Sequence, residues 1–399
     1  MIVSDSPRCA TMPQPSIGLY IHIPFCQTKC IYCNFNTYAR LEHLIPDYVR
    51  ALSHEMKIWG ELLEQPVVRT IFLGGGTPSL LPASEITHVL DAARKSFAVG
   101  REAEITLEAN PGDVVGGKLS CWKALGVNRL SMGVQTFDDG ELQMLTRRHT
   151  AQQAKEAYRR MKAASFDNVS FDLIYGLPKQ SLETWRSTLE QSLELDPLHI
   201  SLYGLTIEEG TPLKQDVESG RLPKPDPDLA ADMYLLAEEM LKGYRHYEIS
   251  NWAKPGYEAK HNLIYWRNEP FLGVGPGAHS YLRGKRFWNI KSPADYVRRL
   301  TIDTGARWPF DEMPTVEEWR ETDPKEEASE TSILKLRLDE GLAIADVESR
   351  FGEAEAQRQT NVLRGFATHS LVAESGGVFR LTSQGRLLSN EIFVKLLPE

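Results

Sequence analysis

Three of the five cysteines in this chain, Cys26, Cys30 and Cys33, stand close together in the spacing C-x3-C-x2-C. The run Ile17–Ile23 before them is short, apolar and rich in β-branched residues, which predicts a buried strand. Pro24 should end that strand because proline cannot donate to a sheet. The three thiols are therefore expected on a loop at the carboxyl end of a strand.

Three thiolates on one loop can bind a metal centre, and the irons of iron–sulfur clusters are normally held by cysteine sulfur. A cubane [4Fe-4S] cluster has four irons, so three ligands leave one iron with an open position for chemistry. Zinc prefers four ligands, which usually come from cysteine and histidine pairs with the spacing C-x2–4-C and H-x3–5-H. His22 is the only nearby histidine, and its strand position is expected to turn it away from the loop. A disulfide would leave one thiol unpaired, so the spacing favours a cluster, with another metal site or a structural role as alternatives.

Short apolar runs recur along the first half of the chain and alternate with amphipathic segments. The predicted strands are Ile17–Ile23, Val67–Leu73, Glu104–Glu108, Val127–Val134, Val169–Ile174 and Ile200–Leu205. The predicted helices include Tyr48–Leu63, Ser84–Phe97, Ala151–Ala164 and Leu182–Leu193. Six such βα units predict a parallel sheet, with functional residues at the carboxyl ends of its strands.

The cysteine motif after an apolar strand resembles the signature of radical S-adenosylmethionine (SAM) enzymes. In that family the open iron binds the amino and carboxylate groups of SAM, and an electron from the cluster cleaves the sulfonium to give a 5′-deoxyadenosyl radical. The resemblance implies an α/β fold: a partial (β/α)6 TIM-like barrel with a smaller C-terminal α+β domain. It also implies two cofactors, a [4Fe-4S] cluster and SAM.

The second half of the chain shows a change of organisation. Residues 220–227 hold three prolines and read as a linker. The expected division is a leader at 1–16, a core barrel at 17–220, a linker and helix region at 221–310, and a C-terminal domain at 311–399. Residues 311–330 carry nine acidic and two basic residues, which predicts an exposed acidic loop or helix. A helix over Glu353–Thr368, a strand–turn–strand and a last helix opened by Thr382 predict a winged-helix-like unit used for packing.

Polar residues and glycines follow the predicted strands at their carboxyl ends. Glycines after Leu73 permit positive φ and a close approach of the backbone to a ligand, although a simple tight turn has the same pattern. The polar residues could equally cap the barrel and meet water. Resemblance to the radical SAM family implies that these positions bind SAM. The implied SAM-binding residues are Tyr20, Gly75, Gly76, Thr77, Glu108, Gln135, Arg147 and Asp172.

Individual roles follow from the same resemblance. Backbone carbonyls of the glycine segment would contact the SAM amino group, Glu108 would bind its ammonium, and Asp172 would bind the ribose hydroxyls. Arg147 would hold the carboxylate through its planar fork of donors. Tyr20 matches a SAM-contacting tyrosine of one branch of the family. No catalytic residue is assigned.

The stretches FLGGGTPS, EANPG, GVQ and DLIYGLP resemble the coproporphyrinogen III oxidase-like branch of the radical SAM family. The oxidases of that branch carry a fourth cysteine two residues after the third, where this chain has Phe35, and a longer amino-terminal extension than the nineteen residues before Tyr20. Both departures are typical of the heme chaperone family HemW. The segment HNLIYW, residues 261–266, resembles the H-N-x-x-Y-W segment of that family and implies His261 as a heme ligand. From the residues alone, a histidine hydrogen-bonded in an aromatic core is the alternative.

Composition limits the partners and the compartment. A net charge of −9 argues against a nucleic acid bound through its phosphates. No apolar run reaches the length of a membrane-spanning helix, and the first sixteen residues lack the pattern of a signal peptide. Few cysteines, mostly clustered, fit a reducing compartment, and the chain is expected in the cytoplasm.

The resemblance implies a heme chaperone that binds heme and a SAM-ligated cluster and delivers the heme to acceptor proteins. It further implies respiratory proteins as acceptors, a peripheral membrane contact and a homodimer. The alternative is an oxidoreductase of the radical SAM type that acts on a tetrapyrrole. A purely structural iron–sulfur protein is less favoured because no fourth ligand is evident.

Overall fold

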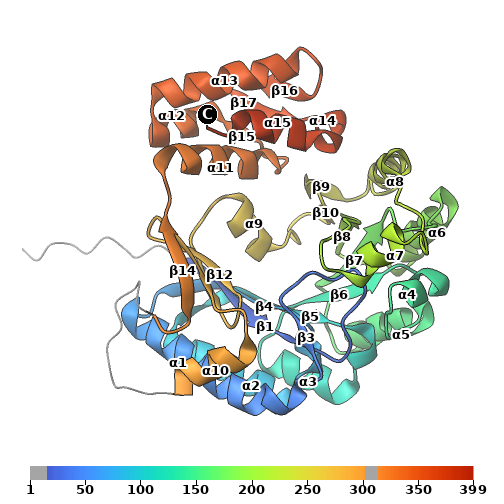
Figure 1. Ribbon diagram of the computed structural model, residues 1–399, viewed down its shortest axis with the longest axis vertical. Helices are drawn as coiled ribbons and strands as arrows, with labels where there is room; N and C mark the ends of the chain where they lie inside the picture. The colour runs from blue at the N-terminus through green and yellow to red at the C-terminus, as the bar shows by residue number, and fades with distance from the viewer. Residues whose placement is uncertain (1–15, 302–312, 399) are drawn as a thin grey trace, which may run out of the picture.

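The computed structural model describes residues 16–301 and 313–398 (Figure 1). The predicted leader up to residue 15, including Cys9, lies outside the described residues, as do Asp311 and Glu312 of the acidic segment. Among the described residues, no helix is long and apolar enough to cross a lipid bilayer.

Six parallel strands form the centre of the fold and pair in chain order, each with the next. They are β1 (Ile17–Ile23), β4 (Val67–Gly75), β5 (Ala98–Ala109), β6 (Arg129–Gln135), β7 (Val169–Tyr175) and β8 (His199–Gly204). All six predicted strands are present. The third is longer than predicted because Val68 of β4 also pairs with Val99, before the register shifts. The predicted α/β fold with a partial barrel is confirmed.

Helices connect these strands. They are α1 (Ile45–Leu62), α2 (Ala83–Ser96), α3 (Gly116–Ala124), α4 (Asp139–Met144), α5 (Ala151–Ala163) and α6 (Leu182–Leu195). The helices follow the outer side of the sheet in Figure 1, from α1 at the lower left through α2 and α3 at the bottom to α4, α5 and α6 on the right. Thr150 and Ser181 begin α5 and α6 with capping boxes, in which each hydroxyl accepts from the N–H three residues on. These local caps explain why the sequence predicted both helices at nearly their observed bounds.

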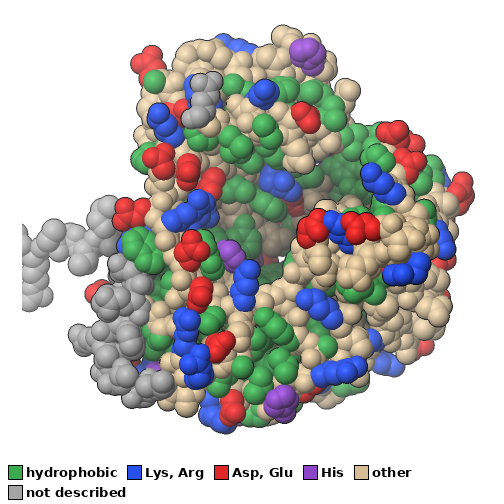
Figure 2. Space-filling model, viewed as in Figure 1, with side chains coloured by type: hydrophobic (Ala, Val, Ile, Leu, Met, Phe, Trp, Pro, Cys, Tyr) green, Lys and Arg blue, Asp and Glu red, His purple; other side chains and the backbone are tan. Residues whose placement is uncertain are grey.

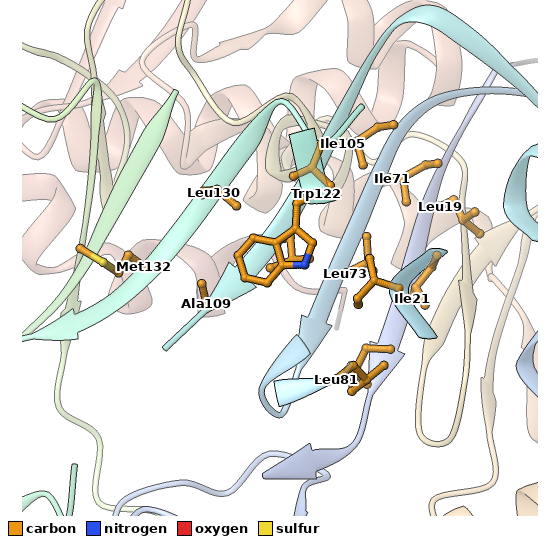
Figure 3. Close-up of a cluster of buried hydrophobic side chains, with 14 of the residues drawn as sticks. Leu19, Ile21, Ile71, Leu73, Leu81, Ile105, Ala109, Trp122, Leu130 and Met132 are labelled. Atoms are coloured by element: carbon orange, nitrogen blue, oxygen red, sulfur yellow. The ribbon is translucent and has the colours of Figure 1, made fainter. Parts of the chain in front are cut away.

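The hydrophobic core lies between the strands and these helices (Figure 3). Side chains alternate along each strand, and on β6 Leu130 and Met132 point into this core. The opposite face of β6 carries Arg129, Ser131 and Gln135, which line a cavity. The alternation therefore separates an apolar packing face from a polar inner face.

The sheet continues beyond the six parallel strands at both edges. Beside β1 lie β11 (Phe271–Val274), β12 (His279–Leu282), β13 (Lys285–Asn289) and β14 (Val316–Glu321), and beside β8 lie β10 (Asn251–Ala253) and β9 (Arg245–Glu248). The sequence did not predict these strands. The acidic segment, expected as a loop or helix surface, is partly β14, an exposed edge strand whose charges discourage further pairing.

The chain after β14 folds around a hydrophobic cluster of its own. It comprises α11 (Pro324–Leu336), β15 (Leu342–Ala343), α12 (Ile344–Phe351), α13 (Glu353–Ala367), β16 (Val372–Ser375), β17 (Val378–Leu381), α14 (Ser383–Leu387) and α15 (Ser389–Leu396). Thr382 caps α14 by accepting from the Gly385 N–H at 3.0 Å. The chain order α11-β15-α12-α13-β16-β17, with the strands paired as β15-β17-β16, is the arrangement of a winged helix. The domain boundaries at residues 220 and 310 remain predictions.

Further short elements complete the chain. They are β2 (Phe25–Cys26), β3 (Tyr38–Ala39), α7 (Pro212–Glu218), α8 (Pro227–Met240), α9 (Lys260–Trp266) and α10 (Pro293–Thr301). Helix α9 lies between the sheet and the C-terminal helices in Figure 1. Its first N–H groups, those of Lys260 and His261, donate to the Glu104 carboxylate of β5 at 3.1 Å each. A carboxylate at a helix N-terminus satisfies donors that lack partners within the helix.

Candidate cofactor site

A cavity of about 520 Å³ lies at the carboxyl ends of the parallel strands, bordered by the cysteine loop. Figure 2 shows the molecule hollowed beneath its C-terminal helices, with hydrophobic side chains inside the hollow. The cavity is lined by Cys26, Cys30, Cys33, Gly75, Gly76, Thr77, Glu108, Gln135, Arg147 and Asp172. All the predicted cofactor-binding residues except Tyr20 and His261 therefore surround one space.

The three cysteines of the loop are free thiols. Cys26 accepts a hydrogen bond from the Thr77 hydroxyl at 3.5 Å, and Cys30 accepts one from Arg147 Nη1 at 3.5 Å. Burial raises the pKa of the Cys26 thiol. Within residues 16–301 and 313–398, no three metal-ligating side chains are already gathered at ligand distance. The donor set, three sulfurs on one loop facing one cavity, fits an iron–sulfur cluster with one open iron.

A chain of hydrogen bonds links the inner face of β1 to the cysteine loop. The Tyr20 hydroxyl lies 2.8 Å from His22 Nδ1, and His22 Nε2 lies 2.9 Å from the Asn36 carbonyl oxygen. Because a carbonyl only accepts, Nε2 carries the hydrogen and Nδ1 accepts from Tyr20. The prediction that His22 points away from the loop is wrong. Position 22 faces inward, and the loop returns over that face of the strand.

The glycine segment after β4 lies against the start of the cysteine loop. Gly75 has a φ of 108° and donates its N–H to Glu108 Oε2 at 3.1 Å. The N–H groups of Gly76 and Thr77 donate to the carbonyls of Ile23 and Phe25 at 2.7 and 2.9 Å. The glycine segment is therefore more than a turn, because its backbone is hydrogen-bonded to the backbone at the start of the cysteine loop. Glycine permits such a close approach of two backbones, or of a backbone to a ligand.

Two partly buried carboxyl groups, those of Glu108 and Asp172, face the cavity from neighbouring parts of the sheet. Burial, and then the nearby Asp172 charge, raises the pKa of Glu108 to about 8. Burial also raises the pKa of Asp172, although Arg129 and hydrogen bonds from serine hydroxyls oppose the rise. Ser131 donates to both Asp172 oxygens at 3.1 and 3.0 Å. Hydrogen bonds from Gly75 and Ser131 thus orient Glu108 and Asp172, and burial favours the neutral form of both carboxyl groups.

Gln135 and Arg147 border the cavity on the side of β6. Gln135 ends β6 with a φ of 70°, a conformation that is rare for a residue other than glycine. Arg147 Nη2 donates to the Gly133 carbonyl at 2.8 Å, and its other terminal nitrogen reaches Cys30. Arg147 therefore places a cation beside the cysteine loop.

His261 lies on α9, and its side chain is almost fully buried in an aromatic cluster. Its Nδ1 lies 2.8 Å from the Thr70 hydroxyl, and its Nε2 lies 2.8 Å from the Tyr265 hydroxyl. Burial lowers the pKa of His261 to about 3, so the ring is neutral. Both ring nitrogens are occupied in this conformation. The role of His261 as a heme ligand remains a prediction.

Several cavity residues were not singled out from the sequence, among them Arg129, Tyr203 and Asn262. Arg129 and Ser131 lie two residues apart on one strand, so strand alternation puts both on the same face. That alternation was readable in the sequence. Nothing local in the sequence places Asn262 of α9 at a cavity formed by β-strand ends.

Comparisons with known proteins found matching family models and similar full-length relatives. The family model described as the radical SAM superfamily matches residues 20–191, and the model described as the HemN C-terminal domain matches residues 322–388. A protein named heme chaperone HemW from Mycobacterium tuberculosis is 36% identical over 98% of both chains. Its namesake from Bacillus subtilis is 36% identical over 95% of this chain and 99% of the relative. A HemW protein from Escherichia coli is 35% identical, over 96% and 99%.

The solved structure of coproporphyrinogen III oxidase (HemN) from Escherichia coli, described as a radical SAM enzyme, matches the fold. The TM-score is 0.83 at 24% sequence identity, over 97% of this chain and 91% of that one. At this identity the likeness is evidence for the fold alone.

Proposed function

Because the chain belongs to the radical SAM superfamily and, within it, to the heme chaperone HemW family, we propose that it binds heme and a SAM-ligated [4Fe-4S] cluster and hands the heme to acceptor proteins. One observation carries the cofactor part of this proposal. Three free cysteines and all the residues expected to hold SAM except Tyr20 line a single cavity at the strand ends. The heme part is supported by the full-length relatives named as heme chaperones.

Each cavity residue then has a task that suits its chemistry. Cys26, Cys30 and Cys33 would hold the cluster, which when bound supplies the electron-transfer chemistry of the superfamily. Arg147, next to the cysteine loop, would hold the SAM carboxylate through its fork of donors. Asp172 would accept from the ribose hydroxyls. Glu108 would accept from the ammonium group once that carboxyl is ionised.

Heme binding is proposed at α9, with His261 as the iron ligand. A neutral imidazole is the form that binds iron, and the low pKa of His261 keeps the ring neutral. Coordination through Nε2 requires the ring to exchange the Tyr265 hydroxyl for iron. Heme at this position would lie close to the SAM cavity, because Asn262 on the same helix lines that cavity.

Delivery completes the proposal. Respiratory proteins would accept the heme, and the protein would contact the membrane only at its surface. It would act in the cytoplasm as a homodimer and would not bind nucleic acid. A second candidate is an enzyme that oxidises a tetrapyrrole, the activity for which the coproporphyrinogen III oxidase of similar fold is named. Phe35, 65% exposed, stands where the oxidases of that branch are expected to carry a fourth cysteine.

The two candidates differ in what the reconstituted protein does. With cluster, reductant and SAM present, we expect it to bind heme, seen as a Soret band after gel filtration, and to leave coproporphyrinogen III unconverted. Product analysis by chromatography measures the second outcome. Sustained formation of protoporphyrinogen IX would move the assignment to the enzyme, and absence of heme binding would contradict the chaperone.

Two single substitutions should separate the SAM site from the heme site. Asp172→Asn should weaken SAM binding about tenfold or more, because loss of a charge-assisted hydrogen bond costs about 1.5–3 kcal/mol, while heme binding stays unchanged. His261→Ala should weaken heme binding or shift the Soret band and leave SAM affinity near normal. Calorimetry with SAM and spectroscopic heme titration measure the two effects. An unchanged heme spectrum in His261→Ala would leave His261 as a packed core residue.

A further inference from the structure

Arg129 is a buried cation on the inner face of the barrel. It begins β6 and is only 2% exposed, yet it lines the cavity together with Ser131, Gly133 and Gln135 of the same strand face. Its side chain therefore lies on the inner side of the barrel, at the cavity that Glu108 and Asp172 also line.

The guanidinium of Arg129 has no direct partner. Within residues 16–301 and 313–398, no hydrogen bond or ion pair involves this side chain, and its Nε is buried without an acceptor. Burying an unpaired charge is costly, and arginine cannot lose its proton to avoid that cost. A well-packed apolar residue would fill the same space without the cost of burying a charge. Space filling alone therefore does not account for an arginine at this position. The presence of Arg129 at the same cavity as Glu108 and Asp172 points to an electrostatic role.

The groups around Arg129 show what that role is. Its charge lowers the pKa of both Glu108 and Asp172, against the rise caused by burial. The nearest histidines do not compete for this role, because burial lowers the pKa of His199 and His261 and leaves both neutral. The titratable or charged groups that act on or are acted on by Glu108 are Arg129, Asp172, Tyr20, Tyr203 and Tyr265. Arg129 is the only cation in that set.

We propose that Arg129 is the internal counter-charge of the SAM cavity, a positioning residue that favours the ionised forms of Glu108 and Asp172, which accept from the ammonium and ribose groups of SAM. This inference rests on the proposed SAM site and adds a residue to it that does not touch the ligand. Arg129 acts through the two acids, from the end of β6 opposite Gln135.

A direct effect of Arg129 on SAM and an effect through Glu108 predict different dependence of SAM affinity on pH. SAM carries a net positive charge, so direct repulsion from Arg129 would make its removal strengthen binding at every pH. Acting through Glu108, removal instead weakens binding where that carboxyl becomes protonated. If the Glu108 pKa of about 8 rises by about one pH unit, about tenfold less of the ionised form remains at pH 7. At a pH above both pKa values the deficit disappears.

The experiment is calorimetric titration of SAM into the anaerobically reconstituted full chain between pH 6.5 and 9. Arg129→Met should bind SAM about tenfold more weakly than the unaltered chain at pH 7 and within about twofold of it near pH 9. Arg129→Lys keeps the charge and should stay close to the unaltered profile. Arg159→Met, on the exposed side of α5, is the matched control. Titration of the SAM amino group itself is common to all four proteins and cancels in the comparison.

Several results would overturn the inference. They are an unchanged affinity at pH 7 in Arg129→Met, an affinity that falls equally at every pH, or a Lys variant that behaves like the Met variant. Circular dichroism and iron content verify that each variant is folded and loaded, and Arg129→Gln replaces Arg129→Met if the latter does not fold. If the unaltered chain itself does not bind SAM, the proposed function has failed, and not the role of Arg129.

Discussion

Replacing Cys26, Cys30 or Cys33 singly by alanine is expected to abolish the [4Fe-4S] cluster. Each substitution removes one of the three sulfurs that face the cavity, and the two that remain cannot hold a cubane whose fourth iron must stay open for SAM. The measurement is the absorption near 400 nm and the spin-resonance signal after anaerobic reconstitution, with iron and sulfide content per chain. SAM binding should be lost with the cluster, because in the proposed site the open iron would be one of the attachment points of SAM.

Cys121→Ala is the matched control for these three variants. Cys121 lies on α3, where its Sγ donates to the Ala83 carbonyl at 3.8 Å, and it does not line the cavity. Its removal should leave the cluster intact. Loss of the cluster in Cys121→Ala, or a full cluster in any of the three loop variants, would show that the ligand set is wrong.

Several of the six parallel strands, among them β1 and β7, could be predicted because they are buried on both faces. A strand of that kind is a short, nearly continuous apolar run, and Ile17–Ile23 or Val169–Tyr175 stand out for that reason. The helices between them are amphipathic and begin at local caps such as Thr150. Polar residues directly after such strands then had to meet at one edge of the sheet, which is why most predicted site residues line one cavity.

The added strands could not be predicted because their signal is not local. β9 and β10 are three or four residues long, and β14 is exposed at five of its six positions. Such strands exist through pairing with distant parts of the chain, which no short window of sequence records. An acidic run then reads as a loop or a helix surface.

The errors within the site have the same origin. The inward position of His22 was readable from strand alternation, but the return of the cysteine loop over that face was not. Arg129 begins a strand, where a charged residue usually contacts solvent. Its burial depends on the rest of the barrel, which surrounds the inner face of β6, and could not be predicted from the local sequence. His261 carried a family motif, yet its bonds to Thr70 and Tyr265 depend on how α9 docks against β4.

Gly76→Ala is expected to damage both the stability of the protein and the cofactor site. A Cβ at this position would lie 2.6 Å from the Phe25 carbonyl oxygen and 2.8 Å from that of Ile23. Both are backbone atoms, so neither can rotate away. Overpacking of this kind costs about 1–3 kcal/mol. Shifting the segment would also weaken the two hydrogen bonds from Gly76 and Thr77, each contributing about 1 kcal/mol.

The same displacement should reach the cluster, because Phe25 directly precedes Cys26 and Thr77 donates to the Cys26 sulfur. We therefore expect Gly76→Ala to lower the midpoint of thermal unfolding and to lose most of its cluster and SAM binding. Gly117→Ala is the control. A Cβ at Gly117, in α3, meets nothing within 4 Å, and alanine is the better helix former. Thermal unfolding, iron content and SAM calorimetry on both variants decide the matter. If Gly76→Ala unfolds at the same temperature as Gly117→Ala and keeps its cluster, the contact between the glycine segment and the cysteine loop does not hold the site together.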